Sequence, residues 1–172
     1  METAYQPESW RDLYVMLGTS SAALMGLLFV ATSLHLEEIV NNPIFQLRAL
    51  RNSIYLIVTL VEAACVLTPQ SIVALGVELI VLNSLGLLLP LSNFYNIYKR
   101  QSFTSRGGFS VYRSATFITG FLLGVGGGVL LVVQWNLGLY VITASYLTLL
   151  VSVSMNAWLI MLGVGQAKPK AS

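Results

Sequence analysis

Two glutamates, Glu62 and Glu78, lie inside long apolar runs of this 172-residue sequence. Each is eight residues from Gln70, which belongs to a Thr-Pro-Gln-Ser stretch between the two runs. An ionised side chain near the centre of a bilayer costs roughly 2.5–3.5 kcal/mol on insertion scales, so acids at that depth are rare and usually functional. The type and spacing of these residues therefore indicate the chemistry of a proton or a cation held inside a membrane.

The equal distances from Gln70 predict that the two glutamates form a pair. In adjacent antiparallel helices both side chains would lie about 12 Å below the turn, at about 1.5 Å per residue. Two negative charges that face each other in an apolar interior are costly, so one carboxylate carries a proton or a cation lies between them. A structural role is the alternative, in which each protonated glutamate bonds to a neighbouring helix and only fixes packing.

Polar residues extend this candidate site along both runs. Tyr55, Thr59 and Glu62 fall near one face of a helix, because steps of three, four and seven residues keep side chains aligned. Asn83 lies inward of Glu78, although around the helix from it. Together with the two glutamates, these residues form the predicted site for handling a proton or a cation, and the sequence leaves a metal ion open.

The apolar runs predict an all-α integral membrane protein, a bundle of five transmembrane helices. Hydrophobic residues make up 56% of the chain and charged residues 9%, whereas soluble proteins have about 25% charged residues. Uncharged windows of about eighteen residues or more are typical of membrane spans. The expected spans cover about 13–34, 45–67, 69–90, 114–133 and 137–162, so the bundle fills 13–163 and leaves tails at 1–12 and 164–172.

Turn residues mark several of these boundaries. Proline suits the first turn of a helix, which predicts Thr68 as the N-cap and Pro69 as the start of the third span. Pro90 would remove a hydrogen bond, so it is expected to end that span. Trp135 and Asn136 form the expected tight turn before the fifth span.

The positions of the basic residues predict the orientation of the bundle. Of the nine Lys and Arg residues, only Arg11 falls on the side that receives the N-terminal tail and the turns after the second and fourth spans. The others fall on the opposite side: Arg48, Arg51, Lys99, Arg100, Arg106, Arg113, Lys168 and Lys170. Because basic residues concentrate in cytoplasmic segments, the N-terminus is expected outside and the C-terminus in the cytoplasm.

Small residues recur at four-residue spacing, which in a bilayer allows close contact between helices. In the first and fourth spans these are Gly18, Ala22, Gly26, Gly120, Gly124 and Gly128. The fifth span carries a more polar stripe of Ala144, Thr148, Ser152 and Asn156. We expect the two glycine stripes to pack helices within one chain or to form the interface of a homo-oligomer.

The first span resembles the opening of a family of small uncharacterised bacterial membrane proteins, which share a W-x-D-x-Y-V start and a G-L-x-F-V-A-x-S-L segment. The matching residues are Trp10, Asp12, Tyr14, Val15, Gly26, Leu27, Phe29, Val30, Ala31, Ser33 and Leu34. The likeness covers the first transmembrane helix, about the first thirty-five residues. It implies a multi-pass protein of the bacterial inner (cytoplasmic) membrane and carries over no activity or site residue.

Motifs of enzymes and of cofactor sites are missing from the sequence. It holds no H-E-x-x-H, no G-x-S-x-G and no phosphate-binding loop before a lysine. The basic segment between the third and fourth spans suits anionic lipid headgroups better than nucleic acid. We therefore expect a protein without enzymatic activity or cofactor, with the lipid bilayer as its partner.

Two functions fit these expectations. The first is a small oligomeric pore or carrier for a cation or a proton, with Glu62 and Glu78 as the ion-binding pair. The second is a non-catalytic accessory or assembly subunit of a larger bacterial membrane complex. Dependence of ion flux on the carboxylates favours the first function, and co-purifying chains favour the second.

Overall fold

The computed structural model describes residues 7–99 and 105–165, and within these ranges every regular element is a helix. The long helices are α1 (Pro7–Leu34), α3 (Pro43–Leu67), α4 (Ile72–Lys99), α5 (Ser105–Val132) and α6 (Gly138–Gly165). A short helix, α2 (Leu36–Val40), was not expected. Five helices are long and apolar enough to cross a membrane, which agrees with the predicted all-α class. The two expected tails consist mostly of residues 1–6 and 166–172, which lie outside the described residues.

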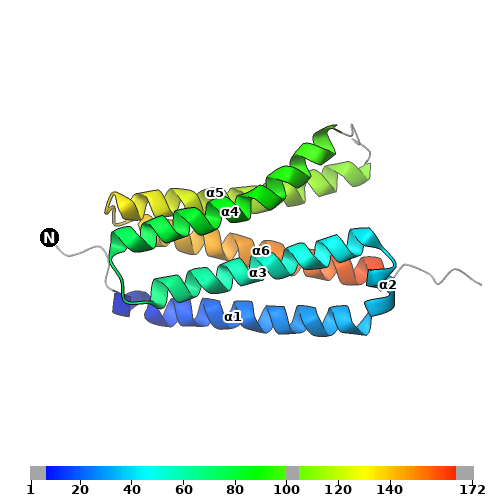
Figure 1. Cartoon of the computed structure of the whole chain (residues 1–172), viewed down its shortest axis with the longest axis horizontal. Coiled ribbons are helices and arrows are strands. Elements are labelled where there is room, and N and C mark those ends of the chain that lie inside the picture. Colours follow the sequence, from blue (N-terminus) through cyan, green and yellow to red (C-terminus); the bar gives the residue numbers. More distant parts are fainter. Residues whose placement is uncertain (1–6, 100–104, 166–172) are drawn as a thin grey trace, which may run out of the picture.

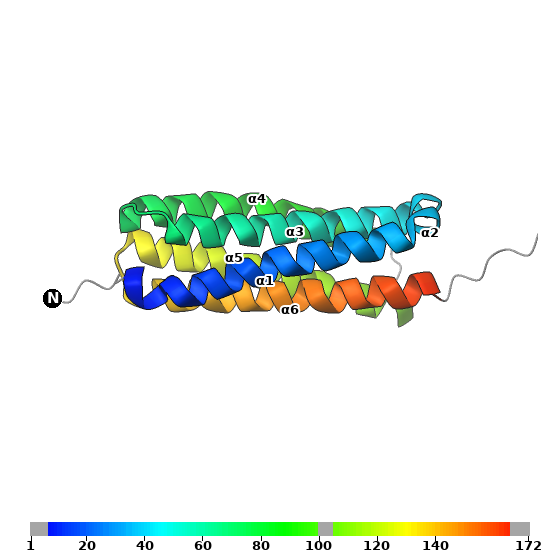
Figure 2. The same ribbon diagram turned by 90° about the horizontal axis from the view of Figure 1, so that it is seen from below.

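The five long helices run alternately in opposite directions along one axis (Figures 1 and 2). The start of α1 and the turns that follow α3 and α5 lie at one end of the bundle, which we call the N-terminal end (Figure 1). The short α2 and the end of α6 lie at the opposite, C-terminal end (Figure 1). Helix α3 contacts α1, α4 and α6, and α6 contacts α1, α3 and α5, so these two helices share the centre of the bundle.

The start of α4 differs from the sequence expectation. The Ser71 hydroxyl accepts a hydrogen bond from the Ala74 backbone N–H at 3.2 Å, which makes Ser71 the N-cap of α4. Thr68 instead donates its hydroxyl to Ala64 O at 2.9 Å and so belongs to the end of α3. The prediction of Thr68 as the cap was therefore wrong, and Pro69 lies in the turn rather than in the helix.

The end of α4 also differs, because the helix continues through Pro90 to Lys99. A proline removes one backbone hydrogen bond and bends a helix without necessarily ending it. The C-terminal turns of α4 rise away from the rest of the helix (Figure 1). The apolar segment nevertheless stops at Ser92, so Pro90 lies near the end of the candidate span but not of the helix.

The predicted turn before α6 occupies residues 133–137, around Trp135 and Asn136. Gln134 has a positive φ of 59°, and its N–H donates to Leu131 O at 2.9 Å. The Trp135 N–H donates to Leu130 O at 2.8 Å. These two bonds around a left-handed residue are the Schellman arrangement that ends α5 and turns the chain back along it.

The small residues of α1 do not share one environment. Gly18 is buried, and a Cβ added there would lie 3.2 Å from Ala63 Cβ on α3. Ala22 and Gly26 are exposed, and a Cβ on Gly26 would meet nothing within 4 Å. Each four-residue step advances by about 40° around a helix of 3.6 residues per turn, so the stripe drifts off the contact with α3.

The glycines of α5 contact two different helices. A Cβ on Gly120 would lie 2.7 Å from Leu149 Cδ2 of α6. A Cβ on Gly128 would lie 2.9 Å from the Gly76 carbonyl oxygen of α4, and one on Gly124 would overlap the Asn83 side chain. These glycines therefore let α5 approach α4 and α6 within a single chain.

Candidate functional site

The residues predicted to form the ion site fall into two environments. Tyr55, Thr59, Glu62 and Asn83 are buried in the bundle, and Glu62 is only 1% exposed. Glu78 is exposed on the surface of α4. Of the acidic side chains that the structure describes, Glu62 alone is buried.

Glu62 lies in a group of buried polar side chains that we call the Glu62 cluster: Ser21 of α1, Thr59 and Glu62 of α3, Asn83 of α4 and Tyr146 of α6. The Ser21 hydroxyl lies 3.1 Å from the Thr59 hydroxyl and 2.9 Å from the Tyr146 hydroxyl. The Asn83 amide lies near the Glu62 carboxyl group, and the Tyr146 hydroxyl is close enough to interact with it electrostatically. Four helices thus converge on one carboxyl group.

Two acceptor atoms of the Glu62 cluster have no hydrogen-bond partner, Glu62 Oε1 and Asn83 Oδ1. The Asn83 amide nitrogen donates to Leu79 O of its own helix at 2.8 Å, which fixes the direction of the amide. Its oxygen points toward Gly124 of α5, where a Cβ would overlap it. The absent side chain of Gly124 therefore makes the room that Asn83 occupies.

Glu78 is held at the N-terminal end by the turn between α3 and α4. Gln70 Nε2 donates to Glu78 Oε2 at 2.9 Å and to Cys65 O at 3.0 Å. The partly buried Cys65 is close enough to both glutamates to interact with them electrostatically. Gln70, Cys65 and Glu78 thus place polar groups on the side of Glu62 that is nearer to this end of the bundle.

The structure does not bring Glu62 and Glu78 together as a buried pair, because only Glu62 faces the interior. The depth also differs from the expected value, since residues 68–71 are not helical. Glu62 is five residues before the end of α3 and Glu78 is six residues after the start of α4. At about 1.5 Å per residue these positions lie about 7.5 and 9 Å from the helix ends.

An apolar layer separates the Glu62 cluster from the C-terminal half of the bundle. On α3 it contains Leu56 and the ring of Tyr55, whose centroid lies 4.4 Å from that of Phe117. On α6 it contains Leu149 and Val153, which are both almost fully buried.

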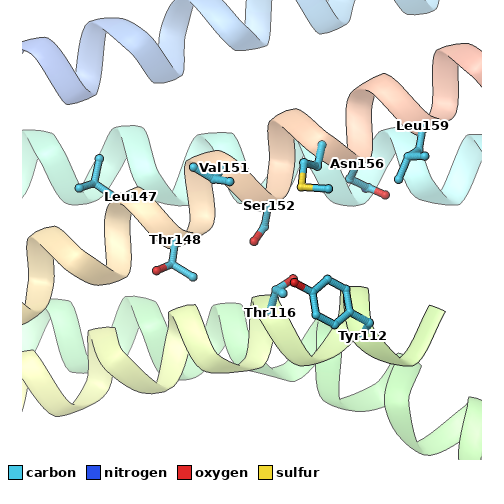
Figure 3. A pocket seen from close by; sticks show the side chains of 9 residues that line it. Tyr112, Thr116, Leu147, Thr148, Val151, Ser152, Asn156 and Leu159 are labelled. Atoms are coloured by element: carbon cyan, nitrogen blue, oxygen red, sulfur yellow. The ribbon is translucent and has the colours of Figure 1, made fainter. Parts of the chain in front are cut away.

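Beyond the layer, a second buried polar contact joins α3 to α6. The Asn156 amide nitrogen donates to Asn52 Oδ1, and Asn52 Nδ2 has no partner. Asn156 also lines a groove of about 380 Å³ between α5 and α6. Tyr112, Thr116, Thr148 and Ser152 place hydroxyl groups along this groove (Figure 3).

Sequence reasoning missed Ser21 and Tyr146 as members of the Glu62 cluster. Both residues lie in the middle of apolar spans, where polar side chains usually bond to another helix. That position is the signal that would have found them. Which helices they join follows only from the packing of α1 and α6 against α3.

The chemistry of the Glu62 cluster is that of a single carboxyl group among hydroxyl and amide groups. Among the described residues, no group of three His, Cys, Asp or Glu side chains lies close enough to hold a metal ion. A single buried carboxyl group with an unpartnered oxygen binds and releases a proton, or contributes one ligand to a small cation.

Comparison with known proteins returned no match: no family, no curated protein and no solved structure is similar to this chain. The resemblance of the first span therefore stays an inference from those residues.

Proposed function

We propose that this protein is a multi-pass membrane protein that carries a proton or a small cation, with Glu62 as the binding residue. The supporting observation is the almost fully buried carboxyl group of Glu62, whose Oε1 has no partner. Ionisable residues inside a membrane bundle are costly and typically mark pathways of ions or protons. Glu78, exposed and bonded to Gln70, lies outside this site.

A carrier fits the surroundings of Glu62 better than an open pore. Cys65, Gln70 and Glu78 place polar groups on the side of Glu62 that is nearer to the N-terminal end. Toward the C-terminal end, Leu56 and Leu149 are each at most 1% exposed, and these packed apolar side chains would block the passage of an ion. An ion at Glu62 would therefore exchange with one side in this conformation and need a rearrangement of the apolar layer to reach the other.

The proposed location is the bacterial inner membrane, with the N-terminus outside. Support comes from the basic residues, which concentrate in the segments at the C-terminal end, and from the resemblance of the first span. Glu62 would then face the external side through Cys65. Reporter domains fused after Ser172 and inserted at Asn136 would be found in the cytoplasm and outside, respectively, and the same side for both would contradict this orientation.

A second candidate function is an accessory or assembly subunit of a larger membrane complex. The observation that favours it is the groove between α5 and α6, which is lined in part by hydroxyl groups, among them those of Tyr112, Thr116 and Thr148. Polar groups along an open groove suit contact with another membrane helix, including one from a second copy in a homo-oligomer. The mass and co-purifying chains of the protein in mild detergent separate these cases.

Ion flux from the purified protein tests the proposed carrier. Wild type and Glu62→Gln are reconstituted into liposomes, and proton, sodium and potassium fluxes are measured under an imposed voltage and pH gradient. We expect wild-type flux of one of these ions and a fall to the protein-free level in Glu62→Gln, because glutamine keeps the shape but cannot ionise. No flux from well-folded wild type would contradict the carrier and favour the accessory subunit.

A further inference from the structure

The hydroxyl groups near Glu62 all donate their hydrogen atoms to acceptors other than Glu62. The Thr59 hydroxyl lies 3.0 Å from Leu56 O and 3.2 Å from Tyr55 O, and it donates because carbonyl groups only accept. Each hydroxyl has one hydrogen, so Ser21 donates to Thr59 and Tyr146 donates to Ser21 across the observed contacts. The chain of donors therefore runs away from Glu62 and ends at the backbone of α3.

The Asn83 amide does not supply enough hydrogen-bond donors to replace those of the hydroxyl groups. One N–H donates to Leu79 O, which leaves at most one N–H for the nearby Glu62 carboxyl group. Glu62 Oε1 and Asn83 Oδ1 both lack a donor. The surroundings of Glu62 thus contain more acceptors than donors, and an ionised carboxylate would add to that excess.

Charged groups do not compensate for a negative charge at this position. The titratable side chains that approach Glu62 are Cys65 of α3, Tyr146 of α6 and, beyond Cys65, Glu78 of α4. Helix α1 contributes the hydroxyl of Ser21, and α5 contributes Gly124 behind Asn83. Cysteine, tyrosine and glutamate side chains are either neutral or negatively charged and never positive. None of the three groups therefore stabilises a buried carboxylate.

We propose that Glu62 is a neutral carboxylic acid at neutral pH, and that the ion held at this site is a proton. A proton on Glu62 removes the charge and supplies the missing hydrogen-bond donor to surroundings that are rich in acceptors. A hard metal cation takes about six oxygen ligands, whereas Ser21 and Thr59 each already use one of their two lone pairs to accept a hydrogen bond. This inference deepens the proposed function by naming its ion, and it rests on that function only for transport.

Infrared spectroscopy of the full chain in lipid vesicles tests the protonation state without any need for flux. A carboxylic acid has a carbonyl stretching band that an ionised carboxylate lacks. We expect this band in wild type at pH 7, its loss in Glu62→Gln and its persistence in Glu78→Gln. Replacing choline chloride with sodium chloride or potassium chloride should leave the band unchanged.

A second variant identifies the band if Glu62→Gln does not fold. Asn83→Leu removes the amide that lies near Glu62, so it should shift the frequency of the band without abolishing it. Absence of the band from folded wild type at pH 7, or its loss on addition of sodium, would overturn the inference. A band without proton flux would instead contradict the proposed transport, so the two claims fail separately.

Discussion

Glu62 and Glu78 are equally far from Gln70 in the sequence, yet they have opposite environments. Glu62 is 1% exposed and faces side chains from α1, α4 and α6. Glu78 is exposed and its Oε2 accepts a hydrogen bond from Gln70. One hydrogen bond from the turn holds the Glu78 carboxylate at the surface, whereas the surroundings of the Glu62 carboxyl group depend on the packing of four helices.

The difference shows that rotation around the helix, rather than distance from the turn, decides whether an acid in an apolar helix is buried. On α4 the buried positions are Leu75, Gly76, Leu79, Asn83, Gly86 and Pro90, which form one face because they recur every three or four residues. Glu78 precedes Leu79 and is therefore rotated by about 100° from this face. Asn83 lies on the buried face and therefore near Glu62, whereas Glu78 lies off that face.

The largest expected effect on stability comes from the residue that makes room for Asn83. A Cβ on Gly124 would overlap the Asn83 amide, and overpacking a core typically costs about 1–3 kcal/mol. Gly124→Ala should therefore lower the free energy of unfolding by about that amount and displace the amide from Glu62. Denaturant unfolding in detergent measures the first effect and the Glu62 infrared band the second.

Gly126→Ala is the matched control for this substitution. It changes the same residue type two positions along α5, where a Cβ meets nothing within 4 Å. Its stability should equal that of wild type or slightly exceed it, because alanine favours helices more than glycine does. Equal effects at Gly124 and Gly126 would show that Asn83 does not depend on the space at Gly124.

A smaller effect is expected at the polar contact on the other side of the apolar layer. Asn52→Ala removes the acceptor of the Asn156 amide, and interhelical hydrogen bonds in membranes average about 0.6 kcal/mol, with a maximum near 1.7. The free energy of unfolding should decrease by an amount within this range, while the infrared band of Glu62 stays unchanged. A change in that band would mean that the apolar layer does not separate the two polar regions.

The sequence predicted the apolar centres of the five helices well, because long uncharged runs have few alternatives in a chain this hydrophobic. It failed at the ends of α4, where Ser71 rather than Thr68 caps the helix and Pro90 lies inside it. Local hydrogen bonds decide the first boundary. At the second, helical structure continues past the end of the apolar segment, where composition gives no signal.

The candidate site could be predicted only within single helices. The common face of Tyr55, Thr59 and Glu62 follows from helical spacing, and all three are buried. Ser21 and Tyr146 could not be assigned to the site, because the hydrogen bonds that place them join α1 to α3 and α1 to α6, between residues 38 and 125 positions apart along the chain. The expected pairing of Glu62 with Glu78 used depth alone and ignored rotation around α4.

Exchanging the acid and the amide between α3 and α4 tests the central claim most directly. Proton flux into vesicles is measured for wild type, Glu62→Gln, Glu78→Gln and the double variant Glu62→Gln with Asn83→Asp. We predict wild-type flux in Glu78→Gln, the protein-free level in Glu62→Gln, and partial recovery in the double variant, which restores a carboxyl group to the Glu62 cluster. Wild-type flux in Glu62→Gln, or an equal loss in Glu78→Gln, would contradict the assignment of Glu62 as the proton-binding residue.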